Sequence, residues 1–283
     1  MNLRIALAAG VVAGVAAIVV ACSTREYALC REHPDEDPAR CGEGGTSGTC
    51  PTGMVFIPVG GGYCIDAKET TVAQYKAWFD TAPTAKNTAL CGWKTQPIAF
   101  QPEKWDTSGQ LAPGRESYPV VEIDWCDAYE YCSAQGKHLC GAIGGGAATY
   151  DVNEGGAWFN ACTHGNDSFH DYPWGNDASA KANCNGAARA AAADASPGLL
   201  PVGSLASCEG PYPRLYDLLG NAAEWIDSCQ PNANVRNALC AQRGGDIAAA
   251  EYLECKNASA YASRDGKGVA TTSPNVGIRC CKP

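Results

Sequence analysis

Residues 118–139 read YPVVEIDWCDAYEYCSAQGKHL, and this stretch decides the fold. Asp124 is a preferred helix N-cap residue. The residues that share one helical face after it are Trp125, Ala128, Tyr129 and Cys132. Gly136 is the residue type most often found just past a helix end. The stretch therefore predicts an amphipathic helix that begins after Asp124 and stops at Gly136.

Two further elements precede this helix. Thr71 and Gln74 have the spacing of a capping box, and apolar residues follow at helical spacing, which predicts a helix over 71–80 with Lys76 on its solvent side. Residues 54–59, MVFIPV, form a short apolar run that ends at the three glycines 60–62. This run predicts a strand that enters a turn.

The rest of the chain lacks long periodic segments. Beyond residue 140 no long helical period appears, and the chain contains 32 glycines, 17 prolines and 7 tryptophans. Such a composition favours short strands and turns over a helical bundle. We therefore expect an α+β fold: a single, irregular, disulfide-rich domain over residues 51–283 with little regular secondary structure.

Seven blocks along this domain resemble, in order, the motifs of formylglycine-generating enzymes, the sulfatase-modifying-factor family. The blocks are 118–139, YPWG at 172–175, NCN at 183–185, PVGS at 201–204, LYDLLGNAAEW at 215–225, RGGD at 243–246 and GIRC at 277–280. The resemblance covers most of the domain. It implies the family's variant of the C-type lectin fold.

The resemblance also bears on catalysis. Enzymes of this family that oxidise a substrate cysteine to formylglycine hold copper between two cysteines, and paired thiolates suit soft Cu(I). Here the first position falls near Ala249, and only Cys255 lies near the second. Asp246 also replaces the serine of the family's RGGS motif. Copper is therefore not expected, and Cys255 is a catalytic candidate only if the oxidase activity is retained.

Structural features of the family imply further sites. The resemblance implies disulfides Cys132–Cys280 and Cys162–Cys255, and Cys229 with Cys240 is close enough in sequence for a local bridge. It also implies calcium, which prefers hard oxygen ligands. The two implied calcium sites comprise Leu219, Gly220, Ala222 and Glu224, and Asn183, Cys184 and Asp194. The alternative for Glu224 is a buried structural carboxylate that binds no metal.

Residues 1–21 resemble a secretory signal. Arg4 precedes a small and apolar run that ends in Val19-Val20-Ala21-Cys22, which resembles the lipobox of bacterial lipoproteins. A transmembrane anchor is the alternative. We expect a lipid on Cys22, a charged and glycine-rich tether over 22–50, and a location in the bacterial cell envelope, at the outer membrane.

The cysteine count agrees with an oxidising compartment. Setting Cys22 aside leaves sixteen of the 17 cysteines, an even number, and no C-x-x-C pair indicates zinc. His164 and His170, near Asp167 and Asp171, could bind a divalent ion, but their spacing is no known helical ligand pair, and we expect a polar surface loop.

Composition and motifs leave two functional classes open. The net charge is −9, and about −10 once Arg4 is removed, which argues against nucleic acid as a partner. The first hypothesis is a non-catalytic, lectin-like module that binds an envelope protein or a glycan. Its candidate stacking residues are Trp93, Trp105 and Trp158, each of which could instead be core. The second is a formylglycine-generating oxidoreductase that acts on a sulfatase-type protein.

Overall fold

The computed structural model describes residues 50–105, 107–165, 170–193, 196, 198–248, 254–256, 260–265 and 275–283. Two four-stranded sheets form its centre. The first has the order β1-β2-β8-β3, with β1 Met54–Ile57, β2 Tyr63–Asp66, β8 Cys280–Lys282 and β3 His138–Leu139. The second has the order β6-β5-β4-β7, with β6 Ala260–Ser263, β5 Leu239–Arg243, β4 Ala223–Cys229 and β7 Val276–Gly277. Only the β4–β7 pairing is parallel among these described strands.

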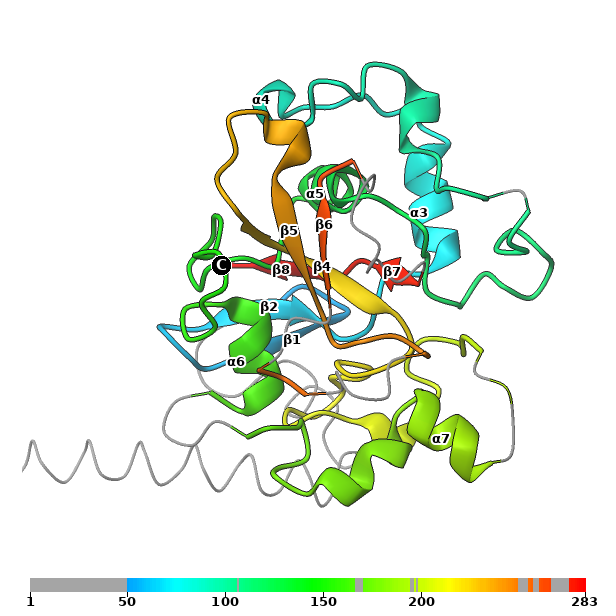
Figure 1. Cartoon of the computed structure of the whole chain (residues 1–283), viewed down its shortest axis with the longest axis vertical. Helices are drawn as coiled ribbons and strands as arrows, with labels where there is room; N and C mark the ends of the chain where they lie inside the picture. The colour runs from blue at the N-terminus through cyan, green and yellow to red at the C-terminus, as the bar shows by residue number, and fades with distance from the viewer. Residues whose placement is uncertain are drawn as a thin grey trace, which may run out of the picture.

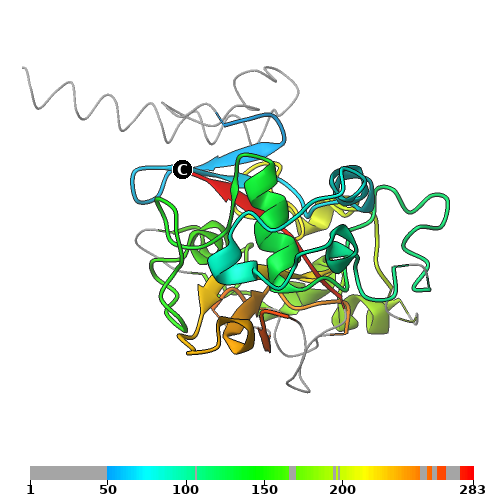
Figure 2. The ribbon, with the colours of Figure 1, turned by 90° about the horizontal axis from the view of Figure 1, so that it is seen from above.

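Helices lie on both sides of the sheets. Figure 1 shows α3 and α5 on one side and α6 and α7 on the other, and Figure 2 shows α5 lying over the C-terminal strand β8. The α-helices are α3 Val72–Phe79, α4 Thr88–Cys91, α5 Trp125–Ala134, α6 Ala157–Thr163 and α7 Ala187–Ala192. Short 3-10 turns, η1 Pro97–Phe100, η2 Ala178–Asn183, η3 Ala206–Cys208 and η4 Val235–Asn237, join them.

Both helices expected from the sequence are confirmed, and local capping explains why. Thr71 accepts a hydrogen bond from the backbone N–H of Gln74, whose side chain accepts from the N–H of Thr71. Asp124 and Asp127 make the same reciprocal pair at the start of α5. Each box satisfies two backbone donors that the first helical turn would otherwise leave unpaired.

Two tryptophans join the opening stretch to the block at 215–225. The indole of Trp125 donates to the carbonyl of Ile226 at 3.0 Å, and the indole of Trp225 donates to the carbonyl of Ile123 at 3.0 Å. Both rings are fully buried, so each N–H needs a partner inside the protein. These reciprocal bonds fix α5 against strand β4.

The hydrophobic core has two large parts, one on each side of β8. Cys280 lies in the core under α3 and α5, and its neighbour Cys281 lies in the core that includes α6. Successive residues of a strand point to opposite faces, which explains the division. Cys280 pairs with Cys132, and Cys281 pairs with Cys140. One short strand is therefore bonded to both halves of the domain.

The sequence did not reveal helices α6 and α7. Helix α6 is buried along its whole length and has no side-chain cap, so it shows neither an amphipathic pattern nor a start signal. The predicted strand at 54–59 is confirmed as β1, with the turn at the three glycines. In the described part of the chain, no helix combines the length and the apolarity needed to span a bilayer.

Residues 1–49 lie outside the described part, so the signal, Cys22 and nearly all of the expected tether stay predictions. Cys50, the last tether residue, forms a disulfide with Cys64 of β2. The expected tether therefore ends on the first sheet.

Candidate functional site

The first candidate is the position where family enzymes would hold copper. Cys255 is fully buried and forms a disulfide with Cys162, with their Cα atoms 5.6 Å apart. Every cysteine among the described residues is disulfide-bonded, in seven bridges. These include Cys132–Cys280, Cys162–Cys255 and Cys229–Cys240, the three pairs named from the sequence. Ala249 lies outside the described residues. The described residues do not fit a two-thiolate copper site, because none of them offers a thiolate.

Glu224, a predicted calcium ligand, forms a buried ion pair. Arg279 donates from Nε to both oxygens of Glu224, at 2.8 and 2.9 Å, and the indole of Trp158 donates to Oε2 at 2.5 Å. Burial raises the pKa of Glu224 and opposes the attraction of Arg279, which lowers it. With both oxygens already bonded, the Glu224 carboxylate does not fit as a calcium ligand in this arrangement.

A second buried carboxylate, Glu69, holds the turn that precedes β4. It accepts from Asn221 Nδ2 and from the backbone N–H of Ala222, both at 2.9 Å. Burial raises the pKa of Glu69 well above its ordinary value, and the nearby carboxylates of Asp217 and Glu224 raise it further. Sequence reasoning missed Glu69, since it lies in none of the recognised blocks.

The other predicted metal ligands do not come together as a described cluster. Leu219, Gly220 and Ala222 lie at the turn that Glu69 holds, and Asn183 and Cys184 lie at the end of η2, where Cys184 pairs with Cys208. Asp194 lies outside the described residues. Within the described ranges, no group of three or more His, Cys, Asp or Glu side chains is arranged to hold a metal ion. Calcium stays a prediction from the resemblance.

His164 and His170 pack ring against ring, and the described residues around them do not form a set of metal ligands. The centroids of His164 and His170 are 5.9 Å apart, and the His164 ring also lies 5.2 Å from that of Tyr212. Asp171 pairs with Lys256 at 2.8 Å, and Asp167 is outside the described residues. The described contacts therefore suit a packed loop.

The tryptophans proposed for ligand stacking are largely core residues. Trp105 and Trp158 are buried, and the indole N–H of Trp158 donates a hydrogen bond to Glu224. Trp93 is half-buried, with the Arg236 guanidinium 5.7 Å from its ring centroid. Trp105 and Trp158 are therefore core residues, the alternative that the sequence left open for them.

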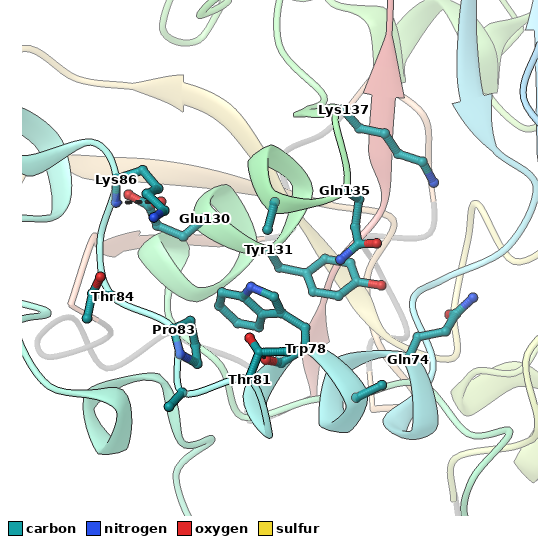
Figure 3. Close-up of a pocket in the computed structure, with 13 residues that line it drawn as sticks. Gln74, Trp78, Thr81, Pro83, Thr84, Lys86, Glu130, Tyr131, Gln135 and Lys137 are labelled. Carbon is teal, nitrogen blue, oxygen red and sulfur yellow. Dashed lines mark hydrogen bonds between the residues drawn. The ribbon is translucent and has the colours of Figure 1, made fainter.

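An open groove between α3 and α5 offers a different site, which we call the α3–α5 groove. Its volume is about 720 Å³, within the range of small-molecule sites. The residues that line it are Gln74, Ala77, Trp78, Thr81, Ala82, Pro83, Thr84, Lys86, Glu130, Tyr131, Ala134, Gln135 and Lys137. In Figure 3, Trp78 and Tyr131 lie between an end with Thr84 and Lys86 and an end with Gln74, Gln135 and Lys137.

The floor of the groove is aromatic and largely buried. The rings of Trp78 and Tyr131 meet edge to face, with centroids 5.6 Å apart. Burial raises the pKa of Tyr131 to about 12, and the negative charge of Asp66 adds to the shift, so its hydroxyl stays neutral near pH 7. Sequence reasoning missed this groove, because aromatic residues at helical spacing predict core whether or not a groove lies above them.

The chain matches one family model and is similar, at low sequence identity, to two solved structures. The family model described as "Sulfatase-modifying factor enzyme 1-like domain" matches residues 53–283. The crystal structure of CarF is 18% identical, covering 78% of this chain and 86% of that one with a TM-score of 0.47. The structure of PvdO from Pseudomonas aeruginosa is 16% identical, covering 78% of this chain and 80% of that one with a TM-score of 0.49.

No curated protein sequence matches the chain. The family model spans both sheets and the α3–α5 groove. The chain therefore belongs to the sulfatase-modifying factor enzyme 1-like family.

Proposed function

We propose that this protein is a non-catalytic binding module of the bacterial cell envelope, anchored by a lipid on Cys22 at the outer membrane. The disulfide between Cys162 and Cys255 is the observation that carries this proposal. This disulfide includes Cys255, the cysteine that lies near the second of the two copper-binding positions of family enzymes. A sulfur atom in a disulfide carries no thiolate charge with which to bind Cu(I).

The α3–α5 groove supports a binding role. It combines an apolar floor with a polar rim, a composition typical of ligand sites. Its lining residues come from α3, α5 and the segments that directly follow each helix, and none is among the residues suggested for catalysis. Binding at the groove therefore needs no chemistry at Cys255.

Anchoring at Cys22 rests on the sequence. A small residue at position 21 and polar residues after position 22 surround the cysteine in the manner of a lipobox. An anchored domain with seven disulfides suits the oxidising side of a membrane. Calcium binding near Asn183 and Cys184 remains part of the proposal.

Thiol counting tests the catalytic half of this proposal. The full chain, denatured without reductant in iodoacetamide, should show no alkylation on any cysteine from Cys50 to Cys281. The same sample after reduction provides the control, in which these cysteines are all alkylated. Two free thiols that include Cys255 would favour the alternative, a formylglycine-generating oxidase.

An activity assay complements the count. The full chain supplied with copper and a cysteine-containing sulfatase peptide should yield no aldehyde detectable with a hydrazide probe. Aldehyde formation above a copper-only control would overturn the non-catalytic assignment.

Labelling with a radioactive fatty acid tests the anchor. In a bacterial host the wild-type chain should carry the label and sediment with membranes, and Cys22→Ser should lose both properties. Cys30→Ser is the matched control, because it alters a nearby cysteine of the tether and should keep the label. A labelled Cys22→Ser chain would contradict the anchor.

A further inference from the structure

Of the seven described disulfides, the bridge between Cys229 and Cys240 is the one that reaches the surface. Thirteen of the fourteen cysteines in these bridges are at most 9% exposed. Cys229, the last residue of β4, is the exception and is partly exposed. Its partner Cys240 on β5 is fully buried. Thiol–disulfide exchange begins when a thiolate reaches a disulfide sulfur, so access favours attack at this bridge, on the Cys229 side.

The bridge joins directly opposite residues of two neighbouring antiparallel strands. Cys229 pairs in register with Cys240, and their sequence separation of 11 is the shortest among the described disulfides. Their Cα atoms are 4.0 Å apart, closer than the usual range of about 4.4–6.8 Å. A bridge outside that range is more easily reduced, because the backbone does not hold the two residues at the separation that a disulfide favours.

Other contacts hold the end of the β4–β5 hairpin when the bridge is open. The N–H of Gln230 donates to the carbonyl of Leu239 at 2.7 Å, directly beside the bridge. Arg264 donates from its backbone N–H to the carbonyl of Ala238 at 3.1 Å and from Nη1 to the carbonyl of Val235 at 3.3 Å. These bonds join the loop between the two strands to the residue that follows β6. The bridge can therefore open without unfolding the hairpin.

The buried sulfur keeps a hydrogen-bond partner after reduction. Sγ of Cys240 lies 3.7 Å from the carbonyl oxygen of Ala238. In the disulfide this sulfur carries no hydrogen, whereas the thiol of the reduced residue can donate to that oxygen. The oxygen already accepts from Arg264, and a carbonyl has lone pairs for two hydrogen bonds. The reduced form of Cys240 therefore fits the same surroundings.

We infer that the Cys229–Cys240 disulfide is a redox switch, which a dithiol reduces while the other described bridges stay oxidised. One thiolate of the dithiol attacks Sγ of Cys229, the S–S bond breaks, and Cys240 leaves as a thiolate that takes up a proton. The second thiol of the dithiol then displaces Cys229 from the mixed disulfide. The dithiol becomes a disulfide, having supplied two electrons and two protons, and both cysteines become thiols. This site is separate from the α3–α5 groove.

The segment that the switch controls is the end of the hairpin, residues 230–239. Its 3-10 turn η4 packs against α4, and Figure 1 shows this orange segment beside α4. The oxidised bridge ties the two ends of the segment together. Reduction removes that covalent tie, so the backbone amides of 230–239 should exchange faster with solvent while those of β1 and β2 stay protected.

Titration with a dithiol tests the inference on the folded full chain. The chain is equilibrated with reduced and oxidised dithiothreitol at increasing ratios and trapped with N-ethylmaleimide, and peptide mass spectrometry assigns each thiol. Cys229 and Cys240 should become labelled at a ratio roughly tenfold lower than any other described bridge requires. Cys50–Cys64 is the matched comparison, because its cysteines are 9% and 7% exposed and it is the next most accessible bridge.

A second reductant identifies the source of the dithiol. Reduced thioredoxin, a protein dithiol, is compared with dithiothreitol at equal dithiol concentration. Faster selective opening by thioredoxin assigns a protein reductant to the switch, and faster selective opening by dithiothreitol assigns a small one.

Two single variants identify the attacked sulfur. Cys240→Ser leaves Cys229 as a partly exposed thiol, and Cys229→Ser leaves Cys240 as a buried one. In the folded chain, Cys240→Ser should react with an aromatic disulfide reagent roughly tenfold faster than Cys229→Ser, since the rate depends on access to the thiol. In urea without reductant the two rates should become equal, which controls for intrinsic reactivity.

Three results would overturn the inference: another bridge opening first, all bridges opening together, or equal reactivity of the two variants in the folded chain. None of these results changes the expected outcome of the aldehyde assay. The switch and the proposed function therefore stand or fall separately.

Discussion

Arg279 and Glu224 form an ion pair in which neither side chain is exposed to solvent, with Arg279 Nη2 2.6 Å from Glu224 Oε1. The same guanidinium donates to the backbone carbonyls of Asp66 at 2.8 Å and Tyr216 at 2.8 Å. It therefore joins strands β2 and β4 to the segment before β8. Glu69 is buried beside this pair, and so is Asp217. The carboxylates of this buried group therefore outnumber its one cation, Arg279.

Removing one partner of this pair should unfold the domain readily. Arg279→Met leaves Glu224 charged and buried without its counterion, and we expect a loss of about 3–5 kcal/mol in the free energy of unfolding. Urea denaturation followed by circular dichroism measures it. The double variant Glu224→Gln with Arg279→Met should lose less than Arg279→Met alone. Arg189→Met, on α7, should change the stability little, and equal losses in both arginine variants would refute the role of the pair.

Asp227 should make the stability of the domain depend on pH. Burial raises the pKa of Asp227 to about 6, against the opposing attraction of Arg264. The folded state then holds the Asp227 proton more tightly than the unfolded state. The free energy of unfolding therefore includes the full contribution of this proton below about pH 4, and that contribution is lost as the pH rises through about 6.

Asp227→Asn removes that dependence. The variant should match wild type near pH 4 and exceed it above pH 7 by on the order of 2 kcal/mol. Urea midpoints at a series of pH values measure the difference. A constant difference between the two proteins across this range would show that Asp227 does not titrate as described.

The Cys91–Cys126 disulfide should contribute both stability and a rigid groove wall. Its sequence separation is 35 residues, for which chain-entropy arguments give about 3–4 kcal/mol. The double variant Cys91→Ala with Cys126→Ala should lose stability of this order. Hydrogen exchange should also accelerate over residues 86–94 more than in α6. Unchanged exchange there would mean that the ion pair of Lys94 with Asp127 of α5 suffices to hold this segment.

The capping box of α3 offers a smaller effect. Thr71→Ala removes the acceptor for the backbone N–H of Gln74, and we expect a loss of about 1 kcal/mol. Thr71→Ser keeps the acceptor and serves as the control. Thermal unfolding should rank wild type and Thr71→Ser together above Thr71→Ala. Equal stability of all three would mean that the cap contributes nothing measurable.

The sequence predicted those elements whose signals are local. Thr71 and Asp124 predict the helices that follow them, because each capping box is formed within four residues of the chain. Helix α6 has no such signal, since it begins at Gly156 and is stabilised by burial on all sides. The fold class came from seven short motifs in order, and the family match over residues 53–283 confirms it.

The candidate groove could not be predicted in the same way. Trp78 and Gln135 are separated by more than fifty residues, and only the packing of α3 on α5 brings them together. Glu224 shows a related limit: a motif identifies a carboxylate, but its partner Arg279 is supplied by a distant part of the chain. Whether that carboxylate binds a cation or a guanidinium depends on this tertiary contact.

The adjacent residues Cys280 and Cys281 also set an order of events during folding. Their bridges reach back 148 and 141 residues, and β8 must enter the first sheet between β2 and β3. A polypeptide that stops short of residue 280 has no native partner for Cys132 or Cys140. The covalent form of both halves of the domain therefore waits on the same two adjacent residues, and a chain arrested before them cannot acquire it.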